Sequence, residues 1–249
     1  MGGKNMKKKV WAGALLGAAV VISTGCGVFE SETFGKGTLN EYKVEVEKDD
    51  AKELEVDLRL GAGEMNVSGG SAEWVTGQIQ YNNEDMEPQV KYDQSGNKGD
   101  IVIKQKKDID VGAGLGNVKN SWDLQFSNKV PIDLRVNSGA SDTNLDLRGM
   151  MLSGLKVDAG VGDVDVNLSG DWKDSFDVDI DTGIGETTVI LPKEAGVRIQ
   201  SEEGIGKSNF YGFTSIGKNT YVNDAFDTAE IIITVNVETG IGEVNFEIE

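Results

Sequence analysis

The chain has 249 residues, of which 24 are basic and 42 are acidic, so its formal net charge is −18. It contains no histidine and one cysteine, which excludes histidine-based catalytic triads, histidine zinc sites and an intrachain disulfide. The acidic surplus repels nucleic acid and anionic lipid headgroups, so we expect no nucleic-acid partner.

The first 25 residues have the pattern of a secretory signal peptide. Four lysines precede the apolar stretch Val10–Ile22, which is shorter than the roughly 20 residues that span a bilayer. Ser23-Thr24-Gly25-Cys26 follows and resembles the lipobox of bacterial lipoproteins, although that motif usually has Leu where this chain has Ser23. The resemblance implies that residues 1–25 are removed and that Cys26 is acylated, which anchors the protein to the extracytoplasmic face of the membrane. An ordinary secretory signal is the alternative.

The segment 1–25 holds four lysines and no acid, so 20 basic and 42 acidic residues remain after its removal, a net charge of −22. Residues 26–40 show no alternation and are expected to form a lipidated tether. We expect an N-terminal β domain over residues 41–125 and C-terminal β repeats over residues 126–249.

One unit recurs seven times: Gly-x-Gly, usually an acid, a variable residue, usually Asn, and an apolar residue. Three consecutive intervals are 21, 23 and 21 residues. A chain that bends sharply between two strands needs a positive φ or a close backbone approach, and glycine allows both. The expected bend residues are Gly61, Gly63, Gly112, Gly114, Gly139, Gly160, Gly162, Gly183, Gly185, Gly204, Gly206, Gly240 and Gly242, with Ser141 at the second glycine position of the third copy.

Apolar and polar residues alternate around each bend, which is typical of half-buried strands. An antiparallel meander and a coil of parallel rungs both fit this alternation. The position six after each first glycine is always apolar, and the position before it is mostly Asn. A coil stacks equivalent positions about 4.8 Å apart and explains both columns. We therefore predict an all-β, β-helix-like solenoid of about 22-residue rungs. The last copy is expected to end the stack, and residues 215–227 to leave it as a loop.

The segments Glu53–Tyr81 (ELEVDLRLGAGEMNVSGGSAEWVTGQIQY) and VKYDQSGNKGDIVIKQ resemble the N-terminal part of the toast-rack family of bacterial envelope proteins. VDVDIDTGIGETTVILP and ITVNVETGIGEVNFEIE resemble its glycine-bend repeats, and also the C-terminal domain of cell-wall-active antibiotic response proteins. The resemblance spans roughly residues 50–249. The resemblance implies an envelope-associated domain without catalytic residues. It also implies a family in which some members modulate envelope-stress signalling.

Acidic residues recur at fixed distances from the bends, as Asp142, Asp163 and Glu186 after them and Asp158, Asp181 and Glu202 before them. If rungs stack, neighbouring like charges cost about 1 kcal/mol per pair in water. A bound Ca²⁺ would offset this repulsion, and carboxylates are suitable ligands. The alternative is a solvated acidic face that discourages aggregation.

We therefore expect a non-catalytic binding or scaffold module with an envelope protein as a candidate partner. It needs no cofactor unless Ca²⁺ binds. A passive adhesin-like surface protein, or an acidic face that binds Ca²⁺ or cationic peptides, is the alternative. Trp74, Trp122 and Trp172 could form a ligand surface, but aromatic residues near strand ends more often close a core.

Overall fold

The computed structural model describes residues 38–107 and 119–249. These residues form strands and one short 3-10 helix, so the all-β prediction is confirmed. The described residues belong to one compact unit. No helix in the described part of the chain is long and apolar enough to cross a bilayer.

Fourteen strands and the helix make up the described residues. They are β1 (Asn40–Val46), β2 (Glu53–Ser71), β3 (Val75–Tyr81), η1 (Glu84–Met86), β4 (Pro88–Ser95), β5 (Lys98–Gln105), β6 (Asn120–Ser127), β7 (Ile132–Asp146), β8 (Leu152–Val161), β9 (Val164–Asn167), β10 (Phe176–Leu191), β11 (Gly196–Phe210), β12 (Thr214–Gly217), β13 (Thr220–Val222) and β14 (Ile232–Ile248).

Each described copy of the repeat forms one bent rung. Strands β2, β7, β10, β11 and β14 carry a copy in their middle, and β8 and β9 are the two halves of another. We call the part before the bend the first arm and the part after it the second arm. Neighbouring rungs pair in parallel and in register. Val189 pairs with Val166 on one side and with Phe246 on the other, and Phe246 pairs with Phe210. A meander would have paired these strands antiparallel.

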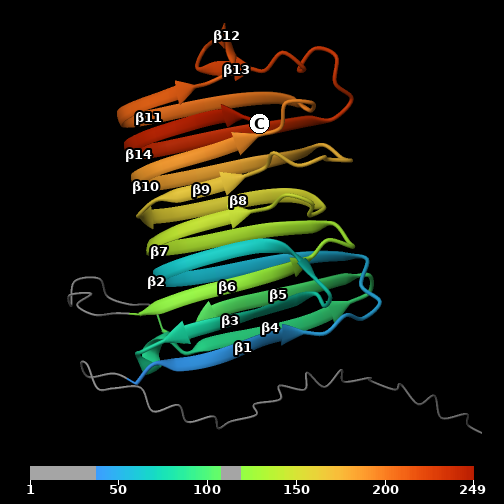
Figure 1. Ribbon diagram of the computed structural model, residues 1–249, viewed down its shortest axis with the longest axis vertical. Coiled ribbons are helices and arrows are strands. Elements are labelled where there is room, and N and C mark those ends of the chain that lie inside the picture. Colours follow the sequence, from blue (N-terminus) through green and yellow to red (C-terminus); the bar gives the residue numbers. More distant parts are fainter. Residues whose placement is uncertain (1–37, 108–118) are drawn as a thin grey trace, which may run out of the picture. The chain divides into compact units, whose positions relative to one another are not determined.

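The order of the strands in space is β1-β3-β6-β2-β7-β8-β10-β14-β11-β13-β12 (Figure 1). The last strand, β14, lies between β10 and β11 and pairs with both. The expectation that the last copy ends the stack is therefore wrong. Val244 and Phe246 in the second arm of β14 are buried, whereas the second arm of β11 has no fully buried residue. The more apolar strand thus takes the interior position and the more polar one the edge.

Residues 215–227 do not leave the stack as a loop, so that expectation is also wrong. They contain most of a hairpin, β12–β13, and β13 pairs antiparallel with the first arm of β11. Tyr221 of β13 stacks on Phe210 with ring centroids 3.5 Å apart, and Phe210 stacks on Phe246 at 5.0 Å. The hairpin therefore covers the end of an apolar column. Strands of three and four residues are too short for alternation to reveal them.

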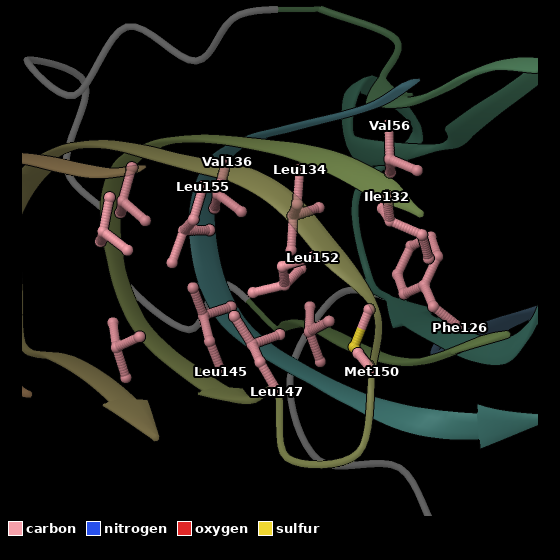
Figure 2. Close-up of a cluster of buried hydrophobic side chains, with 14 of the residues drawn as sticks. Val56, Phe126, Ile132, Leu134, Val136, Leu145, Leu147, Met150, Leu152 and Leu155 are labelled. Atoms are coloured by element: carbon pink, nitrogen blue, oxygen red, sulfur yellow. The ribbon is translucent and has the colours of Figure 1, made fainter. Parts of the chain in front are cut away.

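The core lies between the two arms of the rungs. Leu134 and Val136 from the first arm of β7 lie across this space from Leu145 of its second arm and from Leu147, which follows the strand (Figure 2). All four are fully buried, and a side chain of this kind contributes roughly 1.5–3 kcal/mol when removed from water.

Near β1, at one end of the sheet, the two arms of β2 pair with different strands. The first arm pairs with β5, and β5 pairs in turn with β4. The second arm pairs with β6, β6 pairs with β3, and β3 pairs with β1. The tryptophans Trp74, Trp122 and Trp172 are all buried, so they close the core and form no ligand surface.

The bends bring backbone into direct contact with backbone. Gly185 has a φ of +154°, and a Cβ atom added to it would lie 1.9 Å from the carbonyl oxygen of Gly162 in the neighbouring rung. A larger residue at this position would have to push the two rungs apart.

We predict that Gly185→Ala lowers the free energy of unfolding by about 3 kcal/mol or more, because overpacking and an unfavourable φ add. Urea unfolding followed by circular dichroism measures the change. Gly154→Ala is the matched control, since an added Cβ in β8 would come no closer than 3.8 Å to another residue. It should cost less than about 1 kcal/mol. Equal unfolding midpoints for the two variants would contradict this account of the bends.

Candidate functional site

The outer face of the second arms carries a continuous row of polar side chains, which we call the polar row. The residue five positions after the first glycine of each rung pairs with its equivalent in the next rung. The antiparallel strands β6, β3 and β1 extend the row. From β1 to β11 its members are Lys43, Gln78, Asp123, Asn66, Asn144, Asp165, Thr188, Asn245 and Asn209.

Where the polar row crosses β1, β3, β6, β2 and β7, the surface forms an open groove of about 600 Å³. Its polar lining comes from the row together with Glu41, Ser68, Gln125 and Asp146. Asn66 links two of the strands, because its Nδ2 atom donates to Asp123 Oδ1 at 3.1 Å. We call this groove the polar groove.

The polar groove is acidic overall. Three of its lining residues, Glu41, Asp123 and Asp146, are carboxylates, whereas Lys43 is the one cation in the lining and is 2.6 Å from Glu45. The guanidinium of Arg148 donates to Asp146 at 2.8 and 2.7 Å and lowers the pKa of that carboxyl. Amides supply both donors and acceptors, so the groove can bind a hydroxyl-rich or peptide-like ligand by hydrogen bonds. Its lining contains no cysteine or histidine.

The acids after the bends lie in register, as the repeat predicts. Glu64 pairs with Asp142, and Glu186 pairs with Glu243. The backbone N–H of Asp163 donates to Asp142 at 3.4 Å, and that of Glu186 donates to Asp163 at 3.0 Å. Asp142 and Asp163 therefore each accept a backbone hydrogen bond from the next rung, which offsets part of the repulsion between the charges.

On the later rungs, side-chain amides and one lysine donate the hydrogen bonds to these carboxylates. Asn245 donates to Glu186 at 2.8 Å, and Asn209 donates to Glu243 at 2.7 Å. Lys207 lies 2.9 Å from Glu243, and the hydrogen bond from this lysine lowers the pKa of the Glu243 carboxyl.

The acids before the bends form a second column on the first arms. Asp181 pairs with Asp158 and with Glu238, and Glu238 pairs with Glu202. Lys156 is 3.2 Å from Asp158. Among residues 38–107 and 119–249, no group of three or more carboxylate or cysteine side chains is arranged to hold a metal ion. Binding of Ca²⁺ by the two acidic columns therefore stays a prediction.

Several expected site residues lie outside the described residues, namely Cys26, Gly112 and Gly114. Sequence reasoning missed the part of the polar groove that β1, β3 and β6 supply. The alternation in Asn40–Val46 (NEYKVEV) was the available signal, because it predicts a strand with Glu41, Lys43 and Glu45 on its solvent face.

We predict that Asp163→Ala lowers the free energy of unfolding by about 1 kcal/mol, because the N–H of Glu186 loses its acceptor. Asp163→Asn is the matched control, since it keeps an acceptor oxygen and removes only the charge, and it should cost less.

Thermal melts of the protein in excess Ca²⁺ and in chelator test whether the acidic columns bind calcium. Under the calcium hypothesis Ca²⁺ raises the melting temperature, and a shift below about one degree would reject it.

Similarity to known proteins covers most of the chain. Residues 35–190 match the N-terminal domain of toast_rack. A crystal structure from Clostridium sporogenes ATCC 15579 shares 30% identity with a TM-score of 0.81, over 85% of this chain and 100% of that one. The name of that protein assigns it provisionally to cell adhesion. No curated protein matches the chain in sequence.

Two further structures, from Bacteroides fragilis and Parabacteroides merdae, are named provisionally as adhesins. They cover 84% and 86% of this chain and 97% and 98% of their own, at 10% and 15% identity. Their TM-scores are 0.26 and 0.24, too low to support an argument about this chain. The match over residues 35–190 and the similarity to the Clostridium structure together show that the chain belongs to the toast-rack family.

Proposed function

We propose that the protein is a non-catalytic adhesion module of the bacterial surface that binds its partner through the polar groove. The observation that carries this proposal is the similarity to the Clostridium protein, which extends over that whole chain and whose name refers to cell adhesion. A groove built on paired strands supports it, because a rigid polar surface binds without first having to be ordered.

A binding role also fits the residues that the sequence contains. The chain has no histidine, and its one cysteine is the expected lipid attachment site. Carboxylates are abundant, but those of the acidic columns are hydrogen-bonded within the stack or face solvent. Their arrangement favours structure and recognition over acid–base chemistry.

We further propose that Cys26 carries the lipid and holds the protein on the extracytoplasmic face of the cell membrane. The support is the signal-peptide pattern of residues 1–25 and the small residues before Cys26. Two or three acyl chains hold a protein firmly, because each buried CH₂ contributes about 0.8 kcal/mol. This anchoring would place the polar groove outside the cell.

The second candidate function is a scaffold for an envelope protein, including one that signals envelope stress. The observation that favours it is the family membership, because the resemblance described above implies relatives that modulate envelope-stress signalling. The two functions differ in the partner: a surface outside the cell, or one stoichiometric protein of the same membrane.

The anchor is tested by detergent partitioning of cells that express the full chain. The wild-type protein should enter the detergent phase and incorporate labelled palmitate, whereas Cys26→Ala should enter the aqueous phase without label. Ser23→Leu, which restores the residue usual at that position, is the control and should behave as wild type. Equal partitioning of wild type and Cys26→Ala would reject lipidation.

Adhesion is tested with bacteria that express the full chain and adhere to surfaces coated with cells, mucin or extracellular matrix. Asp123→Arg/Asn144→Arg places two bulky cations in the polar groove and should reduce attachment at least about fivefold. Asp165→Arg/Thr188→Arg makes the same change in charge on the same row outside the groove and should leave attachment unchanged.

Two results would count against adhesion. One is attachment no greater than that of cells without the protein, on every surface. The other is equal attachment by both double variants. Recovery of one stoichiometric membrane protein in a pull-down, lost in Asp123→Arg/Asn144→Arg, would favour the scaffold instead.

A further inference from the structure

Four exposed aliphatic side chains stand in one line along the bends. Val161, Ile184, Ile241 and Ile205 are 51%, 49%, 46% and 71% exposed, and they occupy the position between the two glycines of their rungs. Ile184 pairs with Val161 and with Ile241, and Ile241 pairs with Ile205. We call this line the apolar ridge. It accounts for half of the large apolar residues that are exposed in the described chain.

The fold does not require large apolar residues at this position. In the earlier rungs the same position holds Ala62 and Ala140, which pair with each other, and Ala140 pairs with Val161. The bend is therefore formed equally well around a small residue. Exposing branched apolar side chains in a contiguous line is unfavourable, and such patches on soluble proteins mark interaction sites.

The residues beside the ridge have no side chains. Cβ atoms added to Gly183 and Gly185 would lie 2.3 and 1.9 Å from carbonyl oxygens of the adjacent rung, so both positions must be glycine. The ridge consequently projects from a strip of bare backbone, and a partner can reach the aliphatic side chains from both sides.

The two acidic columns border the ridge. Asp158, Asp181, Glu238 and Glu202 lie three residues before its members, and Asp163, Glu186 and Glu243 lie two residues after them. Lys207 takes the last place on the second side, beside Glu243. Within the described residues, the carboxylates of Asp181, Glu238 and Glu202 make no side-chain hydrogen bond or ion pair, so they are available to a cationic partner.

The charge of the borders decides which partner fits. A second copy of the chain would bring acid against acid, and an anionic membrane surface would be repelled in the same way. The complementary surface is an apolar stripe with basic residues on both sides, which is the pattern of a cationic amphipathic helix. Successive turns of a helix are about 5.4 Å apart and successive rungs about 4.8 Å, so one apolar side chain per turn can lie along the ridge.

We propose that the apolar ridge and its acidic borders are a docking surface for a cationic amphipathic helix. This surface lies on β8 to β11 and β14, whereas the polar groove lies on β1 to β3, β6 and β7. The proposal therefore goes beyond the adhesion function and can fail or hold independently of it.

The test uses a synthetic helical peptide of leucine and lysine, with its leucines on one face and lysines on both sides. Fluorescence anisotropy measures its binding to the full chain with Cys26→Ala, which avoids detergent. A peptide of the same composition, rearranged so that leucine and lysine are spread around the helix, should bind at least about tenfold more weakly. Raising the salt concentration should weaken binding of the first peptide.

Two pairs of substitutions separate the apolar from the ionic contribution. Ile184→Thr/Ile241→Thr keeps branched side chains suited to strands and should weaken binding at least about tenfold. Asp181→Asn/Glu238→Gln should weaken it similarly and reduce its dependence on salt. Ile216→Thr, an exposed isoleucine of β12 that is 60% exposed, is the matched control and should bind as wild type. Urea unfolding verifies that each variant is folded.

Three results would overturn the proposal. Binding unaffected by Ile184→Thr/Ile241→Thr would show that the acidic surface attracts any cation. Equal binding of the rearranged peptide would also show that the surface attracts cations without recognising an amphipathic helix. A change in the sedimentation of the protein alone in that variant would make the ridge an interface between copies of the chain. Asp123→Arg/Asn144→Arg, which alters the polar groove, should bind the helical peptide as wild type. Failure of the ridge proposal therefore leaves the adhesion function untouched.

Discussion

Direct contact between backbones at the bends is the constraint on which the structure depends. Cβ atoms added to Gly162, Gly185, Gly242 and Gly206 would lie 2.1, 1.9, 1.8 and 1.7 Å from a carbonyl oxygen of the adjacent rung. Because no side chain fits there, the rungs can stack at the strand spacing only when their bends are level with one another. Level bends in turn place every equivalent residue of the arms side by side. The buried columns, the polar row, the acidic columns and the apolar ridge are all consequences of that one alignment.

The alignment also concentrates like charges, and the chain offsets this with hydrogen bonds. Carboxylates after the bends accept from backbone N–H groups, from asparagine amides or from a lysine. Carboxylates before the bends have fewer such partners, with Lys156 beside Asp158 as one of them. The two sides of the bend are therefore electrostatically different even though the sequence places acids on both. The side with fewer internal partners retains more capacity to attract a cationic surface.

Periodicity predicts which residues share a column, but it does not predict which rung lies next to which. Val189 is equally compatible with Val166, Phe210 and Phe246, so the place of β14 between β10 and β11 could not be derived from the repeat. The hairpin over Phe210 escaped prediction for a different reason, because it lies outside the repeat. The antiparallel pairing of β1, β3 and β6 escaped it for the same reason. Of the candidate site, the asparagine column was predictable, whereas the polar groove depends on those antiparallel strands. The lipid on Cys26 and the binding of Ca²⁺ remain predictions.

The position of β14 ties the completion of folding to the end of the polypeptide. Strands β10 and β11 are 57 and 36 residues ahead of their partners in β14, as the pairs Asp179–Asn236 and Asn209–Asn245 illustrate. A chain that is made with its N-terminus first can assemble β2, β7 and β8 as they appear. Strand β11 has no parallel partner until β14 has been made, and β10 keeps one edge unpaired until then. A prematurely terminated product would lack this strand, expose unpaired edges on β10 and β11, and be prone to aggregation and proteolysis.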